Sequence, residues 1–286
     1  MTRTRKIKKK SRNFRKGIFD TLCYIAIVVI VAFFLFPLVW EGLTSIKPPP
    51  LVKSPVPRLF FTPSLENWDY LIERNFWHNF KNTCIISLSS SFVTLLVAAL
   101  AAYALTNAEF KGRKSLAIDI LSLRMLPPVA VIIPIFLVMK SYHLYNTYLG
   151  MILIYTTFNL PFSCWLMIGY FKGIPVEIGE AARVDGCSWA NVFWKITLPL
   201  SLPGLVTVFI FCVLFSWSEF LFALILTGEK TQTLPVAAAG VLTHYFTRWG
   251  GLAVIAVFVP LFLLFLRSRY KEIWCGGFLW GLLSRN

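Results

Sequence analysis

Two charged side chains, Arg124 and Glu219, stand inside otherwise apolar stretches of this 286-residue chain. In hydrocarbon each charge costs about 2.5 to 3.5 kcal/mol at mid-depth, so both are expected to face a protein interior. There each either lines a polar pathway or serves packing, as one half of an ion pair or as a side chain that reaches toward the membrane interface.

Three more side chains have the chemistry to bind a hydroxyl-rich ring. Tyr155, Asn159 and Trp217 offer aromatic faces and an amide, which suit stacking on a sugar and hydrogen bonding to it. The same groups also pack inside helix bundles, which is the structural alternative. With the two charges above, they are the candidate pathway or solute residues.

Other site chemistry is not predicted. The three histidines, His78, His143 and His244, have no partners at ligand spacing, and the six cysteines show no metal spacing. No glycine-rich turn ending in lysine is present to bind phosphate, so this chain is not expected to hydrolyse ATP itself. We therefore expect neither an enzyme nor a metal or cofactor in this chain.

The composition indicates that the solvent of this chain is lipid. Hydrophobic residues make up 57% of it, aromatic residues 16%, and the mean hydropathy is +0.69. A net charge of +15 would suggest nucleic acid in a soluble protein. However, nine of the 28 Lys and Arg lie before Ile18, beside the first apolar run, as in an arm that faces anionic lipid. A nucleic-acid partner is not expected.

Six apolar segments are long enough, at 1.5 Å per residue, to cross about 30 Å of hydrocarbon as helices. We expect these spans at about 21–40, 83–106, 116–139, 148–170, 202–226 and 249–266. The first is too long for a cleaved signal peptide, and no small-x-small site follows it. The sequence thus predicts an all-α integral membrane protein with six transmembrane helices.

Six spans put both termini on one side of the membrane. If that side is the cytoplasm, 19 Lys and Arg lie inside against eight outside, which fits the positive-inside rule. The expected organisation is a cytoplasmic basic arm (1–20), a transmembrane domain (21–270) with a cytoplasmic loop (171–200), and a cytoplasmic tail (271–286).

The loop 171–200 reads as two short helices joined by a turn. Pro175 suits a first helical position, Glu177 favours the positive end of the helix dipole, and Gly186 permits a left-handed stop. Ser188 can cap the second helix. The apolar residues of that helix are spaced to share one face: Trp189, Val192, Phe193 and Ile196.

This loop also carries a spaced pattern. Its members are Glu180, Ala181, Ala182, Asp185, Gly186, Ile196, Leu198 and Pro199. The pattern resembles the EAA motif of permease subunits in binding-protein-dependent ABC importers. In that family the segment is the coupling helix, which sits in a groove of the cytoplasmic ATPase, so the resemblance implies that these residues contact a separate ATPase. The alternative is a helical connection with no partner.

The likeness covers about residues 44–270. Its motifs are AAYAL with FKGRK, RMLPP, NTYLG, NLPF and SWSEFLFALILT, which are similar to the carbohydrate-uptake branch of these permeases, with the maltose and glycerol-phosphate systems as familiar members. The resemblance implies the type I ABC importer permease fold in a bacterial or archaeal inner membrane. It also implies four kinds of partner: a second permease subunit, two ABC ATPases that use ATP and Mg²⁺, an external solute-binding protein, and a small solute, a sugar or sugar-like compound.

Three features depart from the family pattern: Cys187 where alanine is usual, Ser218 where asparagine is usual, and the tail after Tyr270.

Three other functions are also compatible with a membrane chain. A stand-alone secondary transporter would show halves related by symmetry and acidic residues at mid-membrane. A membrane-embedded enzyme would cluster His, Asp or Glu at the interface, and a related permease would take a non-sugar solute such as a polyamine or phosphonate.

Overall fold

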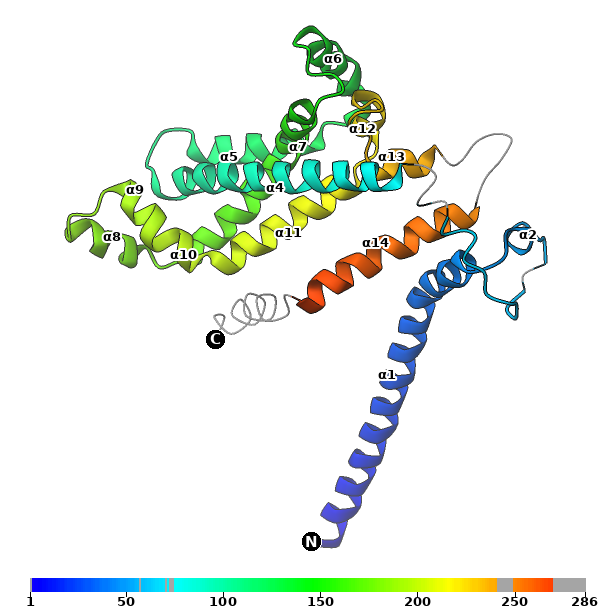
Figure 1. Cartoon of the computed structure of the whole chain (residues 1–286). Coiled ribbons are helices and arrows are strands. Elements are labelled where there is room, and N and C mark those ends of the chain that lie inside the picture. Colours follow the sequence, from blue (N-terminus) through cyan, green and yellow to red (C-terminus); the bar gives the residue numbers. More distant parts are fainter. Residues whose placement is uncertain (1, 57, 70, 72–74, 241–248, 270–286) are drawn as a thin grey trace. The chain divides into compact units, whose positions relative to one another are not determined.

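The computed structural model describes residues 2–56, 58–69, 71, 75–240 and 249–269, with the backbone alone for 2–18 and 262–269. The expected tail 271–286 and His244 lie outside the described residues. All regular elements of the described part are helical (Figure 1). They are α1 (Thr2–Ser45), α2 (Pro49–Val52), α4 (Phe76–Asn107), α5 (Arg113–Ser122), the 3-10 turn η1 (Leu123–Met125), α6 (Pro128–Ser141), α7 (Tyr148–Lys172), α8 (Val176–Val184), α9 (Trp189–Val192), the π-helix η2 (Phe193–Thr197), α10 (Leu198–Leu200), α11 (Leu202–Ser218), α12 (Leu221–Leu226), α13 (Leu234–Ala239) and α14 (Trp249–Arg269).

The chain divides into two compact units, of which the first combines Met1–Leu71 with Thr247–Phe262. Its helix α1 is apolar over Phe19–Ser45 and longer than the expected span 21–40, because the basic arm continues the same helix from Thr2. The apolar side chains of this span are largely exposed, which suits contact with lipid.

Asn67 fastens the first unit together. Its amide donates to the carbonyls of Ser45, the last residue of α1, and of Lys47, at 3.2 and 2.6 Å. A Cβ at Gly250, in the first turn of α14, would collide with the Asn67 side chain. The glycine therefore lets α14 approach the segment that follows α1.

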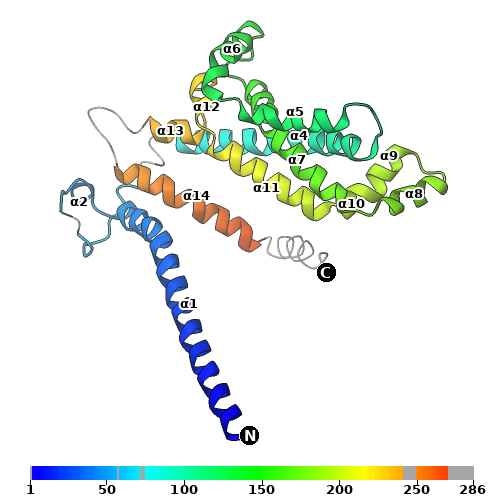
Figure 2. The ribbon, with the colours of Figure 1, turned by 180° about the vertical axis from the view of Figure 1, so that it is seen from behind.

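The second unit, Ile72–Phe246 with Leu263–Asn286, is built on three helices that pack together, α4, α7 and α11 (Figures 1 and 2). Hydroxyls and small side chains of α4 make this close packing possible. Those that are fully buried are Ser87, Ser90, Ser91, Thr94, Ala98 and Ala102. The hydroxyl of Ser90 lies 3.3 Å from that of Ser216 on α11, so the contact between these two helices is polar as well as tight.

Two of the expected spans are broken. The span expected at 116–139 is two helices, Arg113–Met125 and Pro128–Ser141, bent by 93°. Pro127 and Pro128 explain the bend, because proline removes amide donors and restricts the residue before it. The span expected at 202–226 is divided into α11 and α12 by an extended residue, Glu219.

By length and composition, three single helices of the described chain can cross a membrane, and five spans result if each of two bent pairs counts as one. The single helices are Phe19–Ser45, Phe76–Asn107 and Tyr148–Lys172. The bent pairs are Arg113–Met125 with Pro128–Ser141, and Trp189–Leu200 with Leu202–Ser218. Helix α14 coincides with the sixth expected span and is apolar over Trp249–Leu261.

One end of the second unit is tied by two asparagines. Asn146 accepts hydrogen bonds from the amides of Gly228 and Thr231, at 2.9 and 3.3 Å, and so joins the α6–α7 turn to the loop after α12. Asn82 on α4 accepts from Tyr148 on α7 at 2.6 Å. At the opposite end, the hydroxyl of Tyr103 on α4 donates to the carbonyl of Trp189 at 3.1 Å, so helices α8 to α10 lie at that end.

Candidate functional site

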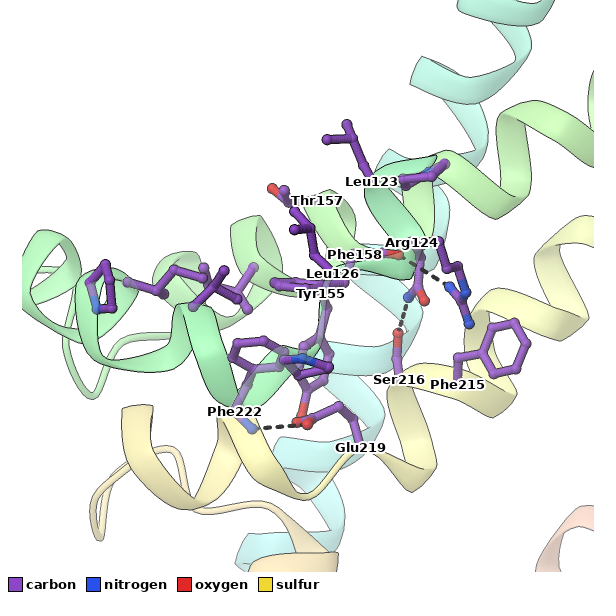
Figure 3. A pocket seen from close by; sticks show the side chains of 17 residues that line it. Leu123, Arg124, Leu126, Tyr155, Thr157, Phe158, Phe215, Ser216, Glu219 and Phe222 are labelled. Carbon is purple, nitrogen blue, oxygen red and sulfur yellow. Dashed lines mark hydrogen bonds between the residues drawn. The ribbon is translucent and has the colours of Figure 1, made fainter. Parts of the chain in front are cut away.

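A cavity of about 740 Å³ lies in the second unit, where two expected spans are broken beside the continuous helix α7 (Figure 3). Its wall comes from the bend between η1 and α6, the middle of α7 around Pro161, and the break between α11 and α12. The volume is within the range of ligand pockets, about 300–1,000 Å³. Four of the five candidate pathway residues line it: Arg124, Tyr155, Asn159 and Glu219.

Arg124 stands on the 3-10 turn at the bend and reaches across to α7 and α11. Its Nη1 donates to the carbonyl of Phe158 at 3.2 Å. Its guanidinium lies over the rings of Phe215 and Phe162, with centroid distances of 4.7 and 5.3 Å. Pro161 removes one amide donor from this part of α7, and Arg124 supplies a donor to a neighbouring carbonyl. The arginine thus has a structural bond and two aromatic contacts, and its side chain stays exposed.

Glu219 closes the break between α11 and α12. Its carboxylate accepts hydrogen bonds from the amides of Phe222 and Ala223, at 2.8 and 3.1 Å, in the first turn of α12. Helix N-termini leave such amides without partners, and a carboxylate there is stabilising. Glu219 therefore serves the fold as a cap of α12, which differs from the ion pair or interfacial side chain expected as its structural role.

Tyr155 and Asn159 belong to the wall of the same cavity, and both side chains are buried. Tyr155 is 3% exposed, and its hydroxyl points toward the Glu219 carboxylate without making a hydrogen bond of regular geometry (Figure 3). The amide of Asn159 donates to the hydroxyl of Ser216 at 2.9 Å. Ser216 is in turn the contact of α11 with Ser90, so one polar chain crosses α7, α11 and α4.

Trp217, the fifth candidate, does not line the cavity. Successive residues on a helix point about 100° apart, so when Ser216 faces the cavity its neighbour turns away. The Trp217 ring instead contacts Phe80 of α4, at a centroid distance of 5.8 Å and an edge-to-face angle. The structure therefore does not bring Trp217 together with the other four candidate residues.

A second candidate site is the loop 171–200, in which α8 is the exposed element. Glu180 and Ala181 face outward, whereas Ala182 is 8% exposed and buried against the loop itself. Gly179, three residues before Ala182, faces Val192 of α9. Of the two alanines in the EAA-like pattern, only Ala181 is thus available to a partner. Val184, at 88% exposed, adds an apolar side chain to this outer face.

The turn between α8 and α9 follows the sequence closely. Gly186 has φ +88°, which confirms the left-handed stop, and the Ser188 hydroxyl accepts from the amide of Asn191 at 3.2 Å, which confirms the cap. Asp185 is exposed at the end of α8. Pro175 precedes the first helical residue by one position, as an N-cap.

Beyond α9 the helix widens to a π-turn, and this shifts the buried face. Val192 and Phe193 are buried as expected, but Thr197 takes the next buried place and Ile196 is half-buried. A π-helix bonds residues five apart, so the inward position moves one residue along the chain. Trp189 was also expected on the buried face and is 51% exposed. Leu198 and Pro199 open the short helix α10 that leads into α11.

The family model for "Binding-protein-dependent transport system inner membrane component" matches residues 94–270, which include α8 and the whole cavity wall. The chain belongs to this family. The permease is accordingly a multi-pass membrane protein and a transport component, and the stand-alone secondary transporter is set aside.

Relatives match the permease over most of its length. It is 35% identical to "Probable ABC transporter permease protein y4oR" of Sinorhizobium fredii, over 91% of this chain and 94% of the relative. It is 29% identical to "Trehalose/maltose transport system permease protein MalG" of Thermococcus litoralis, over 92% and 96%. A chain of a bacterial ABC transporter involved in the import of the acidic polysaccharide alginate shares the fold, with a TM-score of 0.72 at 21% identity over 89% and 96%.

Two residues of these sites were not singled out from the sequence. Ser216 joins Asn159 to α4, and its signal was a hydroxyl three residues before Glu219 in an apolar run. Arg183 donates to the carbonyl of Cys187 at 2.7 Å and lies over the Trp189 ring at 4.9 Å, so it braces the turn of the permease's loop 171–200. In the sequence, only the position of Arg183 between the two alanines and the glycine of the spaced pattern indicates this role.

Proposed function

We propose that this chain forms half of the translocation pathway of an ATP-driven importer and is driven by a separate ATPase through α8. The observation that carries this proposal is the outer face of α8, where Glu180, Ala181 and Val184 are exposed on a helix that is itself firmly held. An exposed apolar side chain beside a small residue and a charge is suited to a protein partner. The partner ATPase would bind and hydrolyse ATP with Mg²⁺, and no cofactor is assigned to this chain.

The bracing of α8 supports a mechanical role. Arg183 fixes the turn after α8, Val192 lies under Gly179, and the Tyr103 hydroxyl joins the start of α9 to α4. The Tyr103 ring also contacts Phe193, at a centroid distance of 4.9 Å. These side-chain contacts can therefore transmit a displacement of α8 to the transmembrane helix α4, without depending on a flexible loop.

The cavity supports a sugar or sugar-like solute. It combines aromatic surface from Phe158 and Phe215 with hydrogen-bonding groups from Arg124 and Asn159. Sugars have both hydroxyls and apolar ring faces, which such a lining can match. The relative named as a trehalose/maltose permease, similar over nearly the whole chain, favours the same class of solute.

The remaining partners and the orientation follow from the same assignment. A second, homologous permease subunit would complete the pathway, and an external solute-binding protein would deliver the solute, as the family description indicates. Helices α8 to α10 and the basic segment around Lys111 lie at one end of the second unit, which we assign to the cytoplasm with both termini. The opposite end, with the loop held by Asn146, would face the binding protein.

The experiment is a charge reversal, Glu180→Lys, in the assembled importer reconstituted in liposomes. The expected result is normal membrane insertion with uptake reduced about tenfold or more, while ATP hydrolysis no longer responds to solute. Glu109→Lys is the matched control, since Glu109 is also exposed and lies in the short loop after α4, outside α8. Unchanged, ATP-dependent uptake in Glu180→Lys would reject the coupling role, as would an equal loss in the control.

A further inference from the structure

Arg124 retains most of its hydrogen-bonding capacity. A guanidinium has five N–H donors in a planar fork, and in the described part of the chain the one acceptor bonded to Arg124 is the carbonyl of Phe158. No carboxylate of a described residue lies within 4 Å of it. The guanidinium lines the cavity and is exposed. It therefore presents uncommitted donors and a positive charge to any molecule there.

The position of this charge is fixed before a ligand arrives. The bond to Phe158 holds one edge of the guanidinium, and the rings of Phe215 and Phe162 hold its plane. Arginine in such a stacked position loses little further freedom when it binds an anion, and its fork matches a carboxylate in a bidentate manner. The site is thus preorganised for a planar anionic group.

The other charge of the cavity does not oppose this. The Glu219 oxygens each accept a backbone amide of α12, and the Tyr155 hydroxyl points toward the same carboxylate (Figure 3). Its negative charge is therefore partly balanced by the helix N-terminus. The two charged groups therefore differ in their hydrogen bonding. The Glu219 carboxylate is bonded to backbone amides, whereas most N–H donors of Arg124 are not used within the described part of the protein.

We propose that the cavity takes an acidic saccharide and that Arg124 binds its carboxylate, with the sugar ring beside Phe215. This inference rests on the proposed function and narrows its solute from sugars in general to sugars with an anionic group. Aromatic rings and Asn159 would bind a neutral sugar equally well. The preference for an anionic sugar therefore rests on the Arg124 guanidinium. A role for Arg124 in the fold alone would be satisfied by its bond to Phe158.

The test uses two probes with the same ring, glucuronate and glucose, which differ at C6 by a carboxylate and a hydroxymethyl group. Their binding to the assembled importer in lipid nanodiscs is measured by saturation-transfer-difference NMR. Wild type is expected to bind glucuronate about tenfold more tightly than glucose, the size of one charge-assisted hydrogen bond. Arg124→Gln removes the charge and the planar fork, and is expected to lose this preference, so that glucuronate binds no more tightly than glucose.

Two further variants separate charge from fold. Arg124→Lys keeps the charge but not the fork, and is expected to retain part of the preference. Lys140→Gln removes one positive charge from an exposed position outside the cavity and is expected to change nothing. If the two probes bind wild type equally, or if the preference survives in Arg124→Gln, the acidic-saccharide inference is overturned and the sugar site stands. If neither probe binds, the inference and the cavity's role as a solute site both fail, while the coupling role of α8 is untouched.

Discussion

In the turn of the loop 171–200, the guanidinium of Arg183 lies 4.9 Å over the ring of Trp189, and its Nη1 donates to the carbonyl of Cys187 at 2.7 Å. These contacts join the end of α8 to the start of α9, in addition to the contact between Gly179 and Val192. The orientation of the exposed face of α8 therefore depends on a side chain that does not belong to that face.

Arg183→Ala is expected to loosen this turn. An exposed cation–π contact and a charged hydrogen bond together contribute about 1 to 3 kcal/mol locally. Uptake by the assembled importer should fall several-fold, while insertion and solute-independent ATP hydrolysis persist. Arg183→Lys is the informative comparison, since lysine can keep the contact with Trp189 but has no fork. Equal uptake in wild type and Arg183→Ala would show that the brace is dispensable.

Gly186→Val and Gly112→Val form a matched pair. Both glycines have positive φ, +88° and +89°, and open space where a Cβ would stand. A β-branched residue in this conformation is strained by about 1 to 3 kcal/mol, so both variants should lose similar thermal stability. Only Gly186→Val should uncouple ATP hydrolysis from uptake. A similar loss of uptake in both would mean that strain alone is responsible.

Glu219→Ala is expected to destabilise the permease through α12. The variant removes the acceptor of two backbone amides, for which the loss of a helix cap gives about 1 to 2 kcal/mol. Glu219→Gln keeps an acceptor and should recover part of the melting temperature. If Glu219→Ala has the melting temperature of wild type, the helix cap does not explain why a charged residue stands in this apolar segment.

Gly204→Ala tests the contact between α11 and α7. An added Cβ would collide with the ring of Tyr170, so either this ring or one of the two helices must shift. Overpacking of this kind costs about 1 to 3 kcal/mol. The double variant Gly204→Ala with Tyr170→Ala should melt at a higher temperature than Gly204→Ala alone. An additive loss in the double variant would contradict the clash.

Local rules predicted some of the site well. The left-handed turn at Gly186 and the cap at Ser188 depend on a few neighbouring residues, so sequence spacing was sufficient. The helical class and the apolar segments followed from composition in the same way. The residues expected to stay out of lipid, Arg124 and Glu219, do share one cavity wall, because hydrocarbon leaves a charged side chain few alternatives.

Other features depend on how helices end against each other. The expected fifth span is interrupted because Glu219 prefers the free amides of α12 to a continuous helix, and the sequence pattern alone does not show that choice. The direction of Trp217 and the exposure of Trp189 depend on helix phase. A single π-turn after Val192 is enough to change that phase for the residues that follow.

The most direct test is site-specific photo-crosslinking at Val184, the 88% exposed residue of α8, in cells that express the whole importer. A photoreactive phenylalanine there should form an adduct with the nucleotide-binding subunit, and the same group at Glu109 should form much less. The account is contradicted if position 184 forms no such adduct. It is also contradicted if position 184 reacts with a membrane-impermeant reagent applied from outside the cell, because α8 could then not contact a cytoplasmic ATPase.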